Sequence, residues 1–81
     1  PSSATLIFEL RVAADAPALG RPLAELALPA GALIITIRRK GDFVVPSGKT
    51  MLQPQDEVLV LADREGARAI ERLVGTAAQA R

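Results

Sequence analysis

The amino-acid sequence predicts a small α+β sandwich, in the order β-α-β-β-β-α, with one sheet and helices packed on it. Segments that alternate apolar and polar residues predict strands, and they follow one another in runs. Only one segment, near the C-terminus, keeps helical spacing over several turns. With 81 residues the chain has room for a single domain, and we expect its core from about residue 5 to about residue 75.

The first half of the chain predicts a strand, a very short helix and a second strand. Thr5–Val12 alternates with a period of two, which is typical of a half-buried strand. Pro22 suits a first helical position, where its missing N–H would have no intrahelical partner. Pro29 then ends the helix, because it disfavours helical backbone at the residue before it. Ala32–Arg39 follows as a strongly apolar strand.

The second half predicts a hairpin, a central strand and the main helix. Lys40-Gly41-Asp42 marks a tight turn, and Asp42–Val45 is the returning strand. Glu57–Ala62 is nearly all aliphatic, which predicts a strand that is covered on both faces. Asp63 is a suitable N-cap for the last helix, and Gly75 is a suitable end.

The composition argues against an enzyme and against a metal protein. The chain has no Cys and no His, so it lacks thiol nucleophiles, the commonest general base and the commonest metal ligands. We therefore expect no catalytic residue, no metal site and no required cofactor. A formal net charge of +1 and two aromatic residues, Phe8 and Phe43, give no sign of a nucleic-acid surface, so we expect no nucleic-acid partner.

Two short motifs contain residue types that bind phosphate in proteins. Ser47-Gly48-Lys49-Thr50 resembles the end of a phosphate-binding loop, but Phe43 stands where that motif needs its first glycine, so we interpret it as a turn. Arg38-Arg39-Lys40 is a compact basic run beside the hairpin turn. It has two interpretations: a site for an anionic ligand, or a solvated strand end that discourages edge pairing.

The predicted sheet has more aliphatic surface than one buried face requires. Simple alternation along the hairpin puts Ile34 and Val44 on the face away from the core. Either helices cover both faces, or one face packs on a second copy of the chain, which would stabilise so small a domain. The sequence leaves both arrangements open.

An ordered set of short segments resembles the TrkA-C domain family, also called RCK-C. The segments run from Leu6 to Leu73, and no single one of them is diagnostic. They are Glu9–Val12, Leu19–Leu26, Leu28–Ile34, Ile37–Gly41, Val45-Pro46, Gly48–Leu52 and Asp56–Val60. The Val-Pro-x-Gly-x-Thr stretch is most similar to the versions attached to bacterial potassium/proton or related cation/proton antiporters. One departure is Gln55, where the family usually has Gly before the Asp.

The resemblance implies a non-enzymatic regulatory domain that forms a homodimer. It implies a position on the cytoplasmic side of the bacterial inner membrane, where the domain acts on the transmembrane transport domain of the same chain. Because the sequence starts with Pro1, we expect a piece of such a larger transporter. Some family members bind cyclic di-AMP at the dimer cleft, so we expect a small regulatory ligand of this kind. Its expected contacts are Ile34, Thr36, Arg38, Arg39, Val45 and Pro46.

Two other functions remain open at this point. The chain is alternatively a dimerisation module without a small-molecule ligand. A third interpretation is a small β domain that binds nucleic acid, although the basic and aromatic residues are few.

Overall fold

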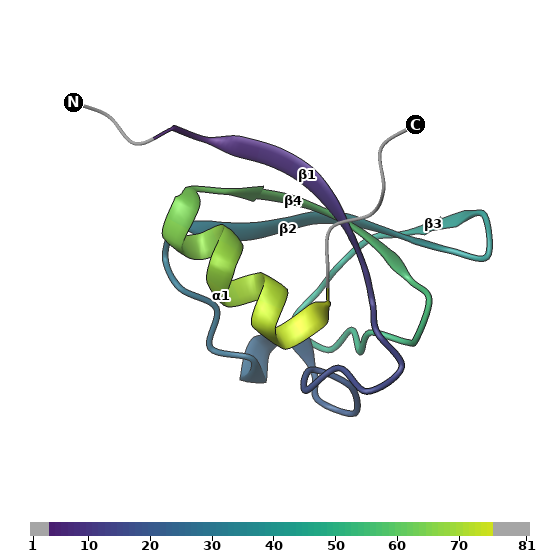
Figure 1. Ribbon diagram of the computed structural model, residues 1–81. Coiled ribbons are helices and arrows are strands. Elements are labelled where there is room, and N and C mark those ends of the chain that lie inside the picture. The colour runs from purple at the N-terminus through teal and green to yellow at the C-terminus, as the bar shows by residue number, and fades with distance from the viewer. Residues whose placement is uncertain (1–3, 76–81) are drawn as a thin grey trace.

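A computed structural model describes residues 4–75 of the chain and shows one sheet with a helix lying across one of its faces (Figure 1). The predicted α+β class and the predicted order of elements are confirmed, except that the first helix is a single 3-10 turn. The elements are β1 (Leu6–Arg11), η1 (Leu23–Glu25), β2 (Ala32–Arg39), β3 (Asp42–Val44), β4 (Glu57–Ala62) and α1 (Arg64–Val74).

The four strands form one antiparallel sheet in the order β1-β4-β2-β3. β4 pairs with β1 on one side and with β2 on the other, so the strand predicted as central is central. α1 packs on one face of this sheet, against β1, β4 and β2. The core lies between the helix and the sheet.

The buried side chains come from one face of β1, β2 and β4, from α1, and from loop residues such as Val12 and Leu52. Leu10, Val58, Ile37 and Ile70 have no exposed surface, and Val60 and Val74 are equally buried. At about 25 cal/mol per Å² of apolar surface, burying each large aliphatic side chain contributes roughly 1.5–3 kcal/mol. This shared core makes the hairpin, the central strand and the helix one cooperative unit.

The prediction that β4 is covered on both faces is wrong. Val58, Val60 and Ala62 are buried under the helix, whereas Leu59 and Leu61 are half-buried on the other face. A continuous aliphatic run does not distinguish a strand between two layers from a strand with one open face. Among residues 4–75 no second helix covers the other side, and we call that side the open face of the sheet.

The prediction that Ile34 lies away from the core is also wrong. Ile34 is 8% exposed and belongs to the core together with Ile37, while Leu33 and Ile35 are exposed. The pairing of β2 with β4 shifts register between Ile34 and Thr36, so one extra residue enters the strand. Such a bulge reverses the alternation of faces on one side of it, which simple period-two counting cannot anticipate. Val44, the other residue assigned to the far face, packs against the same core.

The hairpin turn is the two-residue kind that the sequence predicted. Lys40 has φ 53° and Gly41 has φ 85°, and Arg39 pairs with Asp42 across the turn. Two successive positive φ values define the turn whose twist matches that of antiparallel strands. β3 ends at Val44, one residue earlier than predicted.

The start of α1 is held against the loop before β2. Asp63 is the N-cap, as predicted, and its Oδ1 accepts a hydrogen bond of 2.7 Å from the N–H of Gly66. The N–H of Asp63 donates to the carbonyl of Gly31 at 2.9 Å. The helix ends at Gly75, whose φ of 147° is a conformation that favours glycine.

Candidate functional site

The open face of the sheet carries a row of three charged side chains and one aromatic side chain that crosses all four strands. Arg11, Glu57, Arg38 and Phe43 are successive partners in the register of β1, β4, β2 and β3. Glu57 Oε2 accepts from Arg11 Nη2 and Glu57 Oε1 accepts from Arg38 Nε, both at 3.1 Å. The Arg38 guanidinium carbon lies 5.9 Å from the centre of the Phe43 ring. One carboxylate therefore holds two arginines in place at the hairpin end of the open face.

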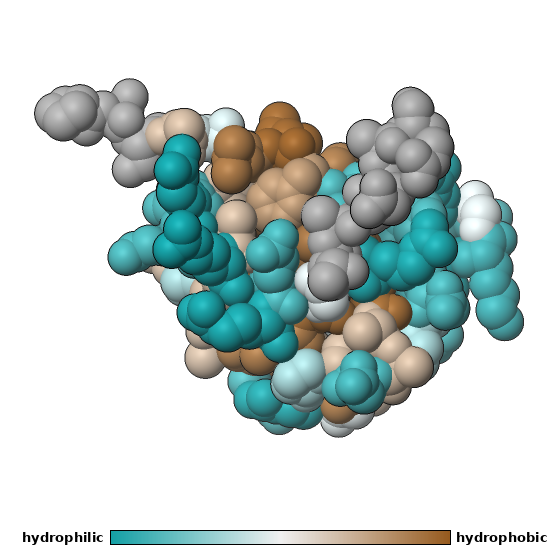
Figure 2. Space-filling model, in the orientation of Figure 1, coloured by the Kyte–Doolittle hydropathy of each residue, from teal (hydrophilic) through white to brown (hydrophobic). Residues whose placement is uncertain are grey.

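The opposite end of the open face is apolar. Ile7, Leu61 and Leu33 are partners across β1, β4 and β2, and Ile35 stands beside them at the bulge. Ile7 is 67% exposed and Leu33 is 56% exposed, although both are large aliphatic side chains. In Figure 2 hydrophobic residues gather along the upper edge of the molecule, over the strands and opposite the helix side. Exposed apolar side chains that gather in one place are typical of surfaces that contact other molecules.

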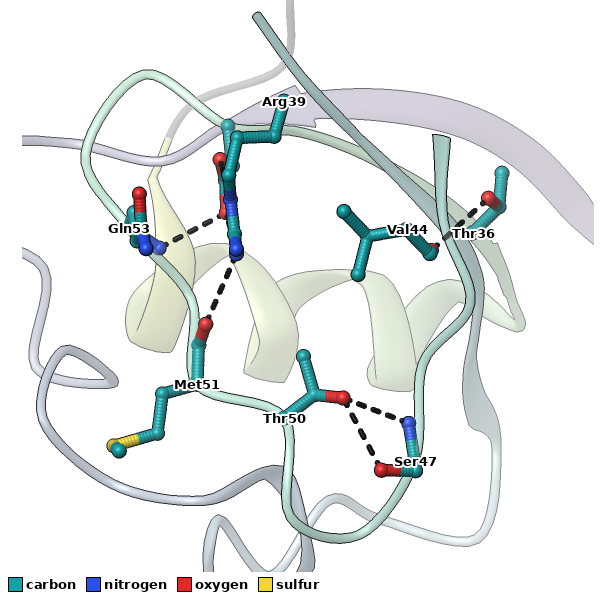
Figure 3. Close-up of polar contacts among 8 residues, drawn as sticks. Thr36, Arg39, Val44, Ser47, Thr50, Met51 and Gln53 are labelled. Atoms are coloured by element: carbon teal, nitrogen blue, oxygen red, sulfur yellow. Dashed lines mark hydrogen bonds and ion pairs between the residues drawn. The ribbon is translucent and has the colours of Figure 1, made fainter. Parts of the chain in front are cut away.

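Arg39 is not part of this row, and its side chain reaches toward Met51 in the loop after β3 (Figure 3). Its Nε and Nη2 donate to Oδ1 and Oδ2 of Asp56 at 2.9 and 2.8 Å, and Nη2 also donates to the carbonyl of Met51 at 3.1 Å. The Asp56 side chain is 1% exposed and also accepts from the N–H of Gln53 at 2.9 Å. The hydrogen bond to Asp56 raises the pKa of Arg39 above its ordinary value, so the guanidinium stays charged.

The six residues expected to bind a ligand do not form one exposed patch. Thr36 and Arg38 lie on the open face, and Val45, which is 85% exposed, follows the end of β3 together with half-buried Pro46. The Thr36 hydroxyl reaches the carbonyl of Val44 at 3.5 Å, which ties β2 to the end of β3 (Figure 3). Ile34 lies in the core beneath them. The structure thus brings four of the six residues to the hairpin, whereas Ile34 lies in the core and Arg39 pairs with Asp56.

The Ser47–Thr50 segment is a turn, as expected, and not a phosphate-binding loop. The Thr50 hydroxyl oxygen accepts from the N–H of Ser47 at 3.0 Å and lies 3.2 Å from the Ser47 hydroxyl (Figure 3). No helix begins at Lys49, so the helix N-terminus that would hold phosphates is missing from this part of the described chain.

Sequence reasoning did not find Arg11, Glu57 or the partner of Arg39. Arg11 and Glu57 are 46 positions apart, and only the register of β1 with β4 brings them together. Asp56 follows Pro54 in a turn, but its buried pairing with Arg39 depends on the packed fold. The alternation of Glu9 and Arg11 with apolar residues in the first strand was the one available signal for a polar face.

Comparison with known proteins identifies the family. The sequence pattern of the TrkA-C domain matches residues 7–75, which is most of the chain. The chain belongs to the TrkA-C domain family. TrkA-C domains are regulatory.

TrkA-C relatives of this chain occur in potassium transport proteins. The chain is 29% identical over 75 residues to the Trk system potassium uptake protein TrkA homolog of Pyrococcus abyssi, covering 91% of this chain and 33% of the relative. It is 32% identical over 77 residues to the K(+)/H(+) antiporter NhaP2 of Shewanella baltica, covering 95% of this chain and 13% of the antiporter. The chain therefore spans only a third or less of the relatives it matches.

Solved structures share the fold. The RCK_C domain dimer of S. agalactiae BusR in complex with c-di-AMP has a TM-score of 0.71 and 24% identity, covering 83% of this chain and 86% of that one. S. agalactiae BusR in complex with its busA-promotor DNA has the same TM-score, and the match covers 85% of this chain and 36% of that chain. Within the described part of this TrkA-C chain, no helix has the length and apolar character needed to cross a bilayer.

Proposed function

We propose that the chain is the regulatory domain of a potassium or cation/proton antiporter on the cytoplasmic side of a bacterial inner membrane. In this proposal the domain forms a homodimer, acts on a transmembrane transport domain and binds a small regulatory ligand, with c-di-AMP as the first candidate. The observation that carries the proposal is the match of nearly the whole chain to the TrkA-C family and to a segment of an antiporter. No catalytic step is part of the proposal.

The apolar end of the open face supports homodimer formation. On folding, a domain of this size buries a smaller fraction of its surface than a large domain does, so it gains more from covering an apolar face with a second copy. Ile7 and Leu33 are the most exposed of the large side chains there, at 67% and 56%. The related BusR domain is a dimer in its solved structure, and we extend that arrangement to this chain.

The end of the hairpin supports the ligand site. Val45 and Phe43 are 85% and 71% exposed, so they offer apolar surface to a planar ring, and Arg38 offers guanidinium donors to a phosphate. We propose Thr36, Arg38, Val45 and Pro46 as direct contacts. Ile34 and Arg39 then act indirectly, because the first fills the core under the site and the second fixes the base of the hairpin.

Regulation requires that the ligand distinguish between two arrangements of the dimer. A ligand with equal affinity for both arrangements shifts neither population, however tightly it binds. In this proposal the ligand site at the hairpin and the pairing surface lie at opposite ends of the same face of the sheet, so the ligand acts on the pairing through the sheet between them. The transport domain then responds to the arrangement that the ligand favours.

Thermal unfolding with and without c-di-AMP tests the ligand. At one hundred times its Kd a ligand stabilises the folded state by about 2.7 kcal/mol. Each kcal/mol raises the melting temperature of a domain this small by about 4–8 °C, so we expect an increase of more than 10 °C. Val45→Asp should abolish the increase, whereas Ala14→Asp, on the loop after β1, should keep it. No increase with c-di-AMP or other nucleotides would leave the dimerisation module as the better account.

A further inference from the structure

We propose that the outer side of α1 is a docking surface for an anionic phospholipid bilayer, held by Arg64, Arg68 and Arg72. We call these three residues the arginine stripe. The inference rests on the proposed function, which puts the domain beside the inner membrane, and it adds a direct contact with the membrane lipids. Because α1 covers the face of the sheet opposite the open face, the stripe shares no residue with the ligand site or the pairing surface.

The arginine stripe follows from the spacing of its residues along the helix. Each arginine is four positions after the one before, slightly more than one turn, so the three side chains follow the helix axis at steps of about 6 Å. All three are exposed, whereas Gly66, Ile70 and Val74 of the same helix are buried. Figure 2 shows hydrophilic residues over much of α1. The stripe is therefore a row of positive charge turned away from the sheet.

Within residues 4–75 the fold makes no use of these three charges. The ion pairs of this part of the chain all involve other arginines, and no arginine of the stripe donates a side-chain hydrogen bond there. Glu65 and Glu71 each lie three positions from Arg68, a spacing that permits an ion pair, yet neither forms one with it. The guanidinium donors of the stripe therefore face solvent.

The arginine stripe lowers the stability of its own helix. Like charges four positions apart repel each other, and the stripe has two such pairs. Arg64 is also the first residue of α1, where the partial positive charge of the helix N-terminus disfavours a cation. Only Arg72, in the last turn, stands where the helix dipole favours its charge. A row of charges that costs stability and has no partner within residues 4–75 points to a partner outside them.

A bilayer of anionic lipids fits this row. A guanidinium presents planar N–H donors that match phosphate oxygens, and a bilayer offers many phosphates side by side, so arginines in a line contact it together. The exposed residues of α1 are the stripe, Glu65 and Glu71, with no apolar side chain among them to enter the lipid. The contact is therefore electrostatic, and salt weakens it.

Vesicles of phosphatidylglycerol, compared with vesicles of phosphatidylcholine at low ionic strength, test the proposal. We expect the chain to sediment with phosphatidylglycerol only, and the amide NMR signals of α1 to broaden more than those of the strands. Arg68→Gln should weaken the binding about fivefold, the usual effect of one cation at an anionic bilayer. Glu71→Gln should strengthen it, because it removes a carboxylate beside the stripe. Lys40→Gln removes the same charge as Arg68→Gln, but at the hairpin turn, and should change the binding little.

The proposal fails if the chain does not bind phosphatidylglycerol, if it binds both lipids equally, or if Lys40→Gln loses as much affinity as Arg68→Gln. Arg68→Gln keeps a folded protein, because the position is exposed and glutamine is a comparable helix former. The result is also distinguishable from that of the proposed function. Stabilisation by c-di-AMP in a chain that does not bind phosphatidylglycerol would reject the docking surface and leave the regulatory proposal standing.

Discussion

Arg39 and Asp56 form the most buried of the ion pairs in residues 4–75. Their side chains are 24% and 1% exposed, against 28% or more for every side chain in the pairs of Glu57. Burying a carboxylate costs several kcal/mol unless hydrogen bonds replace its water. Three donors do so here, namely Nε and Nη2 of Arg39 and the N–H of Gln53. Arg39 is therefore a structural residue first.

We predict that Arg39→Gln lowers the free energy of unfolding by about 3–5 kcal/mol, because it leaves the Asp56 carboxylate buried without its cation. The measurement is urea unfolding, and the control is Arg38→Gln. Arg38 is 46% exposed in its ion pair, so its loss should cost at most about 1 kcal/mol. Equal losses for the two variants would contradict the structural role of Arg39.

Gln55 has a backbone conformation that lowers the stability of the fold, and this effect can be measured. It has φ 75° at the third position of the turn from Gln53 to Asp56, which closes with a 3.1 Å hydrogen bond from the N–H of Asp56 to the carbonyl of Gln53. With Pro54 at the second position, this turn favours glycine at the third. The departure from the family pattern therefore falls on the residue whose backbone conformation is least suited to a side chain.

We predict that Gln55→Gly raises the free energy of unfolding by about 0.5–1 kcal/mol. A side chain in left-handed backbone costs about 1–2 kcal/mol, and glycine removes that cost. Glycine also raises the conformational entropy of the unfolded chain, which offsets part of the gain. Gln53→Gly, in the same turn but without positive φ, should instead lower the stability. A loss of stability in both variants would contradict this account of the turn.

At the scale of elements, the contact between the start of α1 and the loop before β2 has no spare room. A Cβ on Gly66 would collide with the carbonyl group of Gly31, and a Cβ on Gly31 would collide with the Asp63 carboxylate. Two hydrogen bonds lie at this contact: the Gly66 N–H donates to the Asp63 carboxylate, and the Asp63 N–H donates to the Gly31 carbonyl. The helix can pack on the sheet at its present distance only because both positions are glycine.

We predict that Gly66→Ala destabilises the protein by about 1–3 kcal/mol, the usual cost of forced overpacking, although alanine is the better helix former. Arg68→Ala, exposed on the same helix, should change the melting temperature little. Circular dichroism melts of both variants measure the difference. A Gly66→Ala variant as stable as the unmodified chain would show that the helix can move away without cost.

Strands, turns and caps that depend on neighbouring residues were predictable from the sequence. The bulge in β2, which decides which residues of that strand face the core, was not. The bounds of Glu57–Ala62, the turn at Lys40-Gly41 and the cap at Asp63 follow from side-chain chemistry within a few residues. The bulge near Ile35 depends on how β2 meets β4, and no residue type marks it. The bulge moves Ile34 into the core and so removes it from the candidate site. The errors in the predicted ends of strands, such as the end of β3, removed no residue from the site.

The candidate site was predictable in part. The hairpin, with Arg38 and Val45, was recognised from its basic and apolar residues. The row from Arg11 through Glu57 was not, since its members come from different strands and meet only through the register. The role of Arg39 was equally hidden, because its partner Asp56 is 17 positions away and meets it only in the packed fold.

At the scale of the whole molecule, α1 covers one face of the sheet, and no other helix of residues 4–75 covers the second face. The open face has an apolar end at Ile7 and Leu33 and a charged end at Arg11 and Arg38. This separation allows two surfaces on one sheet, one for a second copy of the chain and one for an anionic ligand. In the proposed function, the domain transmits a signal by coupling the binding of its ligand to the pairing of two copies.

We predict that Leu33→Glu prevents homodimer formation, because it puts a charge in the middle of the proposed pairing surface. Leu33 is exposed in the single chain, so the variant should still fold. Met51→Glu is the matched control, since Met51 is also exposed but pairs with Pro22 away from the open face. Light scattering after size-exclusion chromatography measures the mass. A Leu33→Glu variant that still forms the dimer would show that the two copies do not pair through this surface.

Sedimentation velocity of the chain, with and without c-di-AMP, tests the central claim most directly, because it measures pairing and its response to the ligand in one experiment. The regulatory account predicts a dimer at micromolar concentration whose dissociation constant falls when c-di-AMP is added. A chain that sediments as a monomer at every concentration, and does so equally with c-di-AMP, would contradict it.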